Sequence, residues 1–219
     1  MLGVLSRKLK EKDLKRQDII DAAEKVFFSK GFDTATMDDV AKAAEFSKRT
    51  VYVYFRSKDE LYFEIMTRGY ILLNSKLQKA LEVYDLKTGL ENIELIGRLI
   101  IEFSEEYPKY FNAIMEYENK EQDFELTKES LGENSASECY SQGEILLGYL
   151  IKALEDGIVD GSIREDINAK HVAVFLWGSS IGILRTYSTK EKYLKLYHKI
   201  EKQSFFEESM SLLIRAIKK

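Results

Sequence analysis

The chain is organised around the stretch Thr36–Lys58, TMDDVAKAAEFSKRTVYVYFRSK. It predicts a short helix over 37–43, a break, and a second helix over 48–55. Thr36 and Ser47 precede these helices at positions where a hydroxyl oxygen can accept an unpaired backbone N–H of the first turn. Two short helices separated by a brief turn predict a helix-turn-helix.

The second of these helices has one apolar and one polar side. Val51 and Phe55 are four residues apart, so they share a face that can anchor the helix to its neighbours. The remaining residues from 47 to 58 are mostly hydroxyl-bearing or basic, and none is acidic. A helix with such a face suits the major groove of DNA. The candidate DNA contacts are Thr36, Ser47, Lys48, Arg49, Thr50, Tyr52, Tyr54 and Lys58.

Different roles are expected within this set. Lys48, Arg49 and Thr50 are the candidates for contacts to base edges, and the guanidinium of Arg49 suits a bidentate contact to guanine. A phosphate contact is the alternative role for Arg49. Phosphate contacts that fix the register are expected from Thr36, Tyr52, Tyr54 and Lys58.

The segment Ala22–Tyr62, AAEKVFFSKGFDTATMDDVAKAAEFSKRTVYVYFRSKDELY, resembles the N-terminal DNA-binding region of the TetR (tetracycline repressor-like) family. Two positions depart from the family pattern, with Glu45 where glycine is usual and Arg49 where glycine is frequent. Because glycine tolerates a positive φ and glutamate does not readily do so, Glu45 could disturb the turn.

The resemblance implies an all-α protein with two domains. An N-terminal three-helix helix-turn-helix DNA-binding domain is expected over 1–60, and a C-terminal helical bundle for ligand binding and dimerisation over 61–219. A capping box at Ser57 and Glu60 predicts the start of a long helix over about 57–83. This helix would connect the two domains.

The composition agrees with a helical, globular chain of 219 residues. Pro108 is the only proline, and so few helix breakers favour a mostly helical protein. The net charge is −4, but residues 1–60 contain 13 Lys/Arg and 11 Asp/Glu, whereas residues 61–219 contain 20 and 26. The basic character is therefore local, and the acidic remainder disfavours wrong orientations on DNA.

Cysteine usage and hydropathy indicate a cytoplasmic protein. The single cysteine, Cys139, excludes an internal disulfide and predicts a reducing compartment. We interpret it as an inert thiol, with a redox sensor as the alternative. No apolar leader is visible near the N-terminus, and the longest uncharged apolar run, Val172–Leu184, has 13 residues. Such a run is too short to span a bilayer, so no membrane partner is expected.

Hydrophobic periodicity predicts further helices over 13–30, 91–106, 109–118, 137–156, 168–187 and 205–216. Gly31 suits the left-handed position that ends the first of them. The polar segment 120–136 is expected to be a mobile loop around a short helix. Met1–Lys12 is either a frayed terminus or part of a basic arm that reaches the minor groove or phosphates. The arm would use Arg7, Lys8, Lys10, Lys12, Lys15 and Arg16.

The helix expected over 168–187 carries no charge on any side between Val172 and Leu184. A helix of this kind must be buried on several sides. With the last helix it would form half of a four-helix interface in a homodimer, and a purely intrachain core is the alternative. The candidate dimer contacts are Phe175, Trp177, Ser179, Ile183, Phe206, Met210 and Leu213.

The middle helices are rich in aromatic residues. These residues could simply fill a core, or they could line an apolar pocket with a few polar tips, as small-molecule sites do. The resemblance favours a pocket, because C-terminal domains of the family commonly bind an effector. The candidate pocket residues are Phe103, Tyr107, Phe111, Met115, Tyr140 and Trp177.

No motif predicts catalysis. The two histidines, His171 and His198, have no Cys or His partner at ligand spacing, and phosphate-binding or nucleophile-elbow motifs are missing from the sequence. We expect no enzymatic activity, no metal and no cofactor. The sequence thus predicts a homodimeric transcriptional regulator, a repressor that binds a palindromic DNA operator and responds to a small-molecule effector. The alternative is a helical sensor or interaction protein whose head does not bind DNA.

Overall fold

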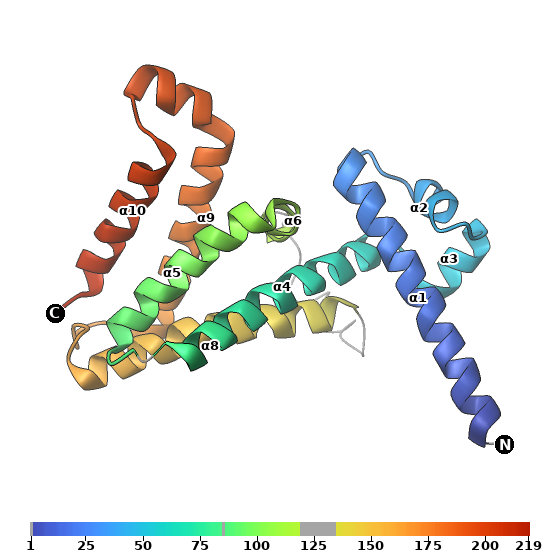
Figure 1. The fold of residues 1–219 in the computed structure, drawn as a ribbon, viewed down its shortest axis with the longest axis horizontal. Coiled ribbons are helices and arrows are strands. Elements are labelled where there is room, and N and C mark those ends of the chain that lie inside the picture. Colours follow the sequence, from blue (N-terminus) through green and yellow to red (C-terminus); the bar gives the residue numbers. More distant parts are fainter. Residues whose placement is uncertain (1, 85, 119–134) are drawn as a thin grey trace. The chain divides into compact units, whose positions relative to one another are not determined.

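The computed structural model describes residues 2–84, 86–118 and 135–219 (Figure 1). These residues are helical apart from the connections between helices and an isolated bridge between Ile163 and Lys218. The prediction of an all-α fold is confirmed.

The chain divides into two compact units. The N-terminal unit comprises Met1–Gly69 with Glu116–Ser141, and the C-terminal unit comprises Tyr70–Met115 with Gln142–Lys219. The division passes through a long helix rather than at its start, so the domain limits 1–60 and 61–219 stay a prediction.

The N-terminal unit begins with α1 (Leu2–Lys30), α2 (Met37–Ala43) and α3 (Lys48–Tyr54), followed by the first part of α4 (Lys58–Val83). The predicted bounds of α2 agree with the structure, and α3 ends one residue earlier than predicted. The start of α1 was predicted too late, at residue 13. Good helix formers fill the preceding segment, and an ion pair joins Arg7 and Glu11 at 3.4 Å across one turn.

The core of this unit forms where α1, α2 and α4 meet. Ile19, Ala23 and Val26 of α1 are buried, as their spacing predicts. Gly31 has φ 80° and ends α1 at the predicted position. Phe32 then turns inward, and its ring centroid lies 4.5 Å from that of Tyr62 on α4.

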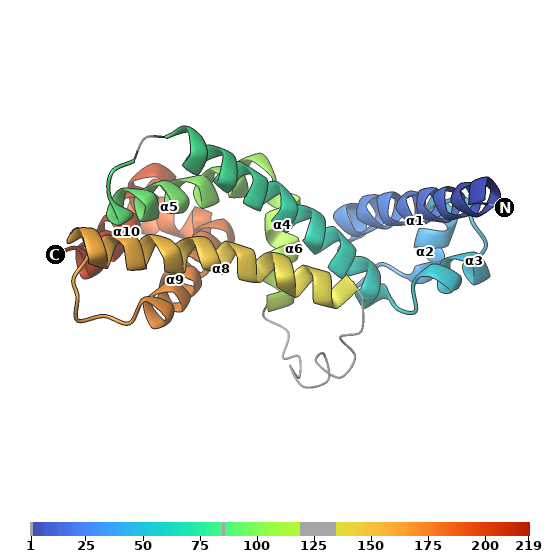
Figure 2. The ribbon, with the colours of Figure 1, turned by 90° about the horizontal axis from the view of Figure 1, so that it is seen from below.

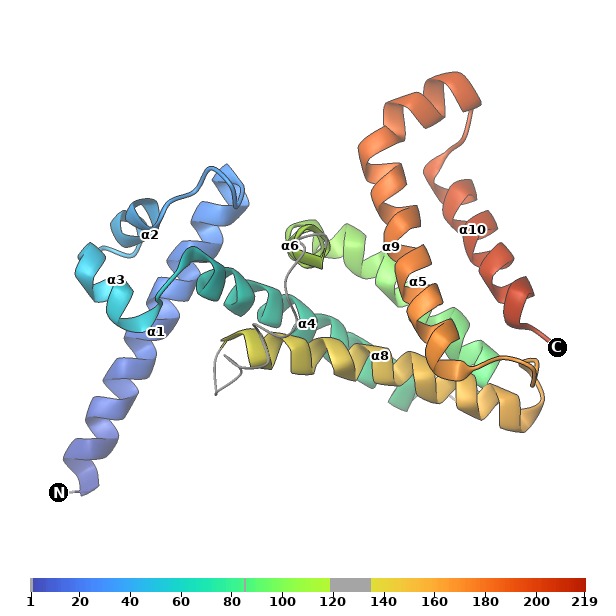
Figure 3. The same cartoon turned by 180° about the vertical axis from the view of Figure 1, so that it is seen from behind.

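The C-terminal unit contains the rest of α4 and most of α6 and α8, whose other ends belong to the N-terminal unit. Its helices are α5 (Gly89–Glu106), α6 (Pro108–Glu118), α8 (Ser135–Asp160), α9 (Ala169–Tyr193), the π-helix η1 (Leu194–His198) and α10 (Lys202–Ile217). Within this unit α9 and α10 run side by side and join through η1 (Figure 3).

Local sequence explains where these helices start. Thr88 and Glu91 form a capping box, so α5 begins at Gly89 rather than at residue 91. Pro108 does not merely separate two helices, because it occupies the first position of α6, where a missing N–H costs nothing. Asn168 caps α9 by accepting the backbone N–H of His171 at 3.0 Å.

Two contacts hold the C-terminal unit together around the start of α5 and the turn after α8. A Cβ added at Gly89 would collide with the backbone of Gly157, so α5 and α8 meet at two glycines. The backbone N–H of Arg164 donates to the carbonyl of Ile217 at 2.9 Å, which ties the chain end to the turn after α8. Nearer the start of α8, Gln142 accepts a hydrogen bond from Asn74 of α4 at 3.0 Å. The two helices lie alongside each other there (Figure 2).

The later helices are longer than predicted. The structure has α8 over 135–160, α9 over 169–193 and α10 over 202–217. No proline or glycine follows Tyr187, so α9 continues and widens into η1, a π-helix that was not predicted. It ends at Lys199, whose φ is 56°. The loop expected over 120–136 lies, up to residue 134, outside the described residues.

Candidate nucleic-acid interface

The turn between α2 and α3 is centred on Glu45. Its φ of 57° lies in the left-handed region, which glycine adopts freely and other residues adopt at a cost. The backbone N–H of Phe46 donates to the carbonyl of Ala41 at 3.0 Å, and that of Glu45 to Lys42 at 3.3 Å. These are the two hydrogen bonds of a Schellman motif. Glu45 therefore retains the turn, with some backbone strain.

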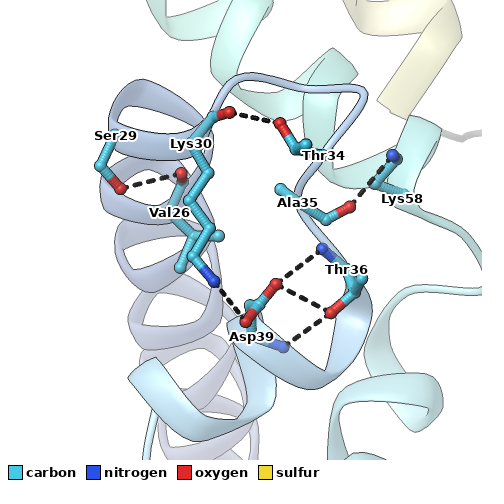
Figure 4. Close-up of polar contacts among 8 residues, drawn as sticks. All are labelled: Val26, Ser29, Lys30, Thr34, Ala35, Thr36, Asp39 and Lys58. Atoms are coloured by element: carbon cyan, nitrogen blue, oxygen red, sulfur yellow. Dashed lines mark hydrogen bonds and ion pairs between the residues drawn. The ribbon is translucent and has the colours of Figure 1, made fainter.

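A hydrogen-bonded network fixes the start of α2 (Figure 4). Thr36 Oγ1 accepts the backbone N–H of Asp39 at 3.2 Å, and Asp39 Oδ2 accepts the backbone N–H of Thr36 at 3.0 Å. Lys30 Nζ of α1 lies 2.6 Å from Asp39 Oδ1. Hydrogen bonds from Lys30 and then Thr36 lower the pKa of Asp39 from 3.8 to about 2. Thr36 is thus a helix cap, and its phosphate contact stays a prediction.

The start of α3 is also capped as predicted. Ser47 Oγ accepts the backbone N–H of Thr50 at 3.1 Å, and the two hydroxyl oxygens lie 2.8 Å apart. Val51 and Phe55 are 0% and 1% exposed, which confirms that they anchor α3. The opposite side of the helix is therefore free to face a ligand.

Lys48 and Arg49 lie on that outer side, and both are exposed. Lys48 Nζ is 2.7 Å from Asp38 Oδ1 of α2, and this hydrogen bond raises the pKa of Lys48. Among the described residues, Arg49 has neither an ion pair nor a hydrogen bond from its side chain. Its guanidinium is thus available to a base or a phosphate.

The tyrosines and a valine complete this surface. Tyr52 is 44% exposed, whereas Tyr54 is half-buried. Val53 is 72% exposed and was missed by the sequence analysis. The position could have been noticed in the sequence, because an apolar β-branched residue stands there between two tyrosines of the polar helix face. An apolar side chain on such a helix suits the methyl group of thymine.

Lys58 has a different environment from the other predicted contacts. Its Nζ donates to the carbonyls of Phe32 at 2.7 Å and Ala35 at 3.1 Å, and lies 4.3 Å from the centre of the Phe32 ring. The ammonium therefore holds the loop between α1 and α2. A phosphate contact by Lys58 stays a prediction and would need this ammonium to be shared.

The predicted basic arm is helical, as part of α1. Arg16 pairs with Glu64 of α4 and lies over the ring of Phe55 at 5.2 Å, so it serves the core rather than an arm. The side chain of Lys8 lies outside the described set. The exposed candidates are Arg7, Lys10, Lys12 and Lys15.

Comparison with known proteins agrees with this geometry. Residues 19–65 match the family model described as bacterial regulatory proteins, tetR family. The chain is 31% identical over 153 residues to the HTH-type transcriptional regulator YhgD of Bacillus subtilis, an alignment that covers 67% of this chain and 70% of that protein. The chain belongs to the TetR family. It is a DNA-binding transcriptional regulator.

Two further comparisons extend over most of this TetR-family protein. The HTH-type transcriptional repressor NicS of Pseudomonas putida is 28% identical over 75% of this chain and 73% of its own length. The crystal structure of FadR from Bacillus subtilis in complex with stearoyl-CoA superposes with a TM-score of 0.69 at 16% identity, covering 90% of this chain and 97% of that one. At this identity the superposition shows a shared fold.

The candidate pocket residues of the regulator are dispersed. Phe103, Phe111 and Met115 are buried on α5 and α6, and the rings of Phe103 and Tyr107 lie 5.3 Å apart. Tyr140 belongs to the N-terminal unit, where its ring lies 6.4 Å from that of Phe63. Trp177 borders a small void between α5, α8, α9 and α10. Their role in one pocket stays a prediction.

A cleft of about 510 Å³ lies elsewhere in the C-terminal unit, between α4, α5 and α8. Its lining is more polar than the predicted aromatic pocket. It includes Gln78, Glu82, Asn92, Tyr149 and Asp156. These residues come from three helices, so hydrophobic periodicity gave no signal that they share a site.

The candidate dimer residues lie on two sides of α9 and α10. Phe206 is 6% exposed, and Met210 packs against Gly97 of α5, so both are mainly core residues. Trp177, Ile183 and Leu213 also border internal voids. Phe175 is 55% exposed and Ser179 is half-buried. Both helices are present as predicted. The sequence could not distinguish their inward and outward faces, because both faces are apolar. The dimer contacts stay a prediction.

Two features are absent from the residues that the structure describes. No helix among them is long and apolar enough to cross a bilayer. They also contain no group of three or more His, Cys, Asp or Glu side chains placed to hold a metal ion.

Proposed function

We propose that this TetR-family protein is a ligand-responsive repressor that binds a palindromic operator as a homodimer. The observation that carries the proposal is the outer side of α3, where Lys48 and Arg49 are exposed on a helix anchored by Val51 and Phe55. The relative NicS, which aligns over 75% of this chain, is a repressor, and this supports repression.

DNA would be held by α3 in the major groove. Lys48, Arg49 and Thr50 are proposed to reach base edges, with Val53 against a thymine methyl group. Ser47, Tyr52 and Tyr54 would contact the phosphate backbone of the DNA and fix the register of α3 in the groove. The retained turn at Glu45 supports DNA binding over a head that has lost this activity.

Dimerisation would use the outer side of α9. Val174 and Phe175 are 57% and 55% exposed, and Gly178 and Gly182 one and two turns on have open space where a Cβ would stand. Leu212 of α10 is 61% exposed. Exposed apolar surface next to small residues supports close packing against a second copy, which would place two heads on a symmetric operator.

An effector would act through the C-terminal domain, which we propose comprises residues 61–219. The cleft between α4, α5 and α8 supports this role because it touches the helix that enters both units. The stearoyl-CoA complex of FadR supports an organic effector. A ligand that converts a 1:99 equilibrium between two states into 99:1 must favour one state by roughly 5.5 kcal/mol.

Selection from random duplexes with the full-length protein tests the DNA-binding part of this proposal. We expect enrichment of two inverted half-sites about one helical turn apart. Arg49→Ala should then lose affinity mainly through one base pair of the operator. Uniform weakening over all operator variants would reject base reading by Arg49. The ligand switch would be rejected if every compound that binds the protein left its affinity for the operator unchanged.

A further inference from the structure

A groove of about 820 Å³ runs between α5 and α10 of the C-terminal unit. Its floor is apolar and includes Ile101, Phe206, Met210 and Ile214. Its size falls in the range of small-molecule sites. The groove differs from the cleft between α4, α5 and α8, with which it shares no lining residue.

The two ends of the groove carry opposite charge. Lys202 Nζ lies 2.6 Å from Glu105 Oε1, and Met210 packs over Gly97, so α5 and α10 run antiparallel along it. Arg98, Arg215 and Lys218 therefore line the end that also contains Glu94. The other end contains Glu102, Glu105 and Glu207 with Lys202.

The carboxylates of the acidic end already have partners. Glu105 pairs with Lys202 at 2.6 Å, and Glu102 with Lys76 at 3.4 Å. Glu207 accepts a hydrogen bond from Gln203 at 2.9 Å. Gln203 is neutral, and Lys76 is shared with Glu106 at 2.8 Å. This end therefore keeps a negative charge, which repels an anionic head group.

The cations of the basic end lack such partners. Within the described part of the chain, Arg98 and Lys218 have no ion pair, and Arg215 donates only to the carbonyl of Ser211, at 3.3 Å. Glu94 is a single carboxylate against these three cations. The excess charge of the basic end is therefore positive, and it lies at one end of an apolar floor.

The groove would stay open in the proposed dimer. Another side of α10 carries Phe205, Ser209, Leu212 and Ala216 at helical spacing, and Leu212 and Ala216 are exposed on it. Met210 and Ile214 face the opposite side of the same helix. A second copy seated on the outward side therefore leaves the groove free.

We propose that this groove binds an amphiphile that has an anionic head group and an apolar chain. The head lies among Arg98, Arg215 and Lys218, and the chain lies along Ile101 and Met210. Binding is a property of the C-terminal unit, whereas any effect of binding on an operator rests on the proposed function.

Calorimetric titration of the full-length protein with decanoate, 1-decanol and decyltrimethylammonium tests this site. Decanoate should bind most tightly of the three. The variant Arg98→Gln/Arg215→Gln/Lys218→Gln should weaken decanoate roughly tenfold, from three exposed charge contacts, and leave decanol within about twofold. The matched control Lys170→Gln/Lys190→Gln/Lys192→Gln removes three exposed cations outside the groove and should leave both affinities unchanged.

Methyl resonances of the five methionines locate the bound probe. Decanoate should shift the Met210 methyl signal and leave that of Met37, in the N-terminal unit, in place. Equal affinity for decanoate and decanol, equal losses in the two triple variants, or an unshifted Met210 signal would overturn the proposal. These measurements use no DNA, so failure to bind any duplex would reject the proposed function without touching the groove.

Discussion

Glu45 occupies a backbone conformation in which glycine is favoured, and its side chain is exposed. The left-handed conformation costs a residue with a Cβ about 1–2 kcal/mol, which exceeds the extra chain entropy of glycine, about 0.4–1 kcal/mol. We expect Glu45→Gly to raise the free energy of unfolding by about 0.5–1 kcal/mol in urea titrations. Glu155→Gly, at an exposed position inside α8, should lower it by about 1 kcal/mol. A loss of stability in both variants would contradict the strain at Glu45.

Asp39 makes the stability of the helix-turn-helix depend on pH. Its pKa is about 2 in the folded protein and 3.8 ordinarily, so the ionised group stabilises the fold above pH 3.8, and this contribution is lost as pH falls through 2. We expect the stability difference between wild type and Asp39→Asn to be constant near neutral pH and to shrink between pH 4 and 2. Chemical denaturation at several pH values measures it, and a constant difference down to pH 2 would refute the assignment.

The interface residues differ in how far the sequence could predict them. Thr36 and Ser47 were predicted correctly as caps, because a cap depends on residues three or four positions away. Two other contacts depend on how the helices pack. Lys48 pairs with Asp38, and Lys58 donates to carbonyls more than twenty residues away. Sequence spacing carries no such information.

Arg68 joins helix α4 to helix α1. Its guanidinium lies 2.6 Å from Asp21 and 2.9 Å from Glu24, and its side chain is 28% exposed. Because the ion pairs form a network around one partly buried cation, Arg68→Ala should destabilise the N-terminal unit by about 1–2 kcal/mol. Lys152→Ala, which removes a more exposed pair with Asp156, should change stability by less than about 0.5 kcal/mol. Thermal unfolding compares the two, and equal effects would contradict a structural role for Arg68.

Helix identity was easier to predict than helix length. The apolar spacing in α5 and α10 placed both correctly, because each buries one clear stripe. The start of α1 and the end of α9 were predicted wrongly, because neither is marked by a proline or a cap. The charge groups of the α5–α10 groove come from two helices about a hundred residues apart, so only the fold brings them together.

The proposed dimer depends mainly on contacts made by the outer side of α9. Gly178→Glu would put a charge on its outer side, where Gly178 has open space in the single chain. We expect the dimer dissociation constant to rise at least tenfold, about 1.4 kcal/mol, in sedimentation experiments. Gly148 of α8 has equally open space, and Gly148→Glu should leave the association unchanged. An unchanged dimer in the Gly178 variant would exclude this face.

We propose that α3 gives the protein its preference for one DNA sequence. The most direct test is the affinity of wild type and of Lys48→Ala/Arg49→Ala for a selected and a scrambled duplex over a range of salt concentrations. For wild type we predict at least about a thousandfold preference for the selected duplex, with affinity for the scrambled duplex falling steeply as salt rises. The double variant should lose most of that preference. Equal wild-type affinity for both duplexes, or an unchanged preference in the variant, would contradict the claim.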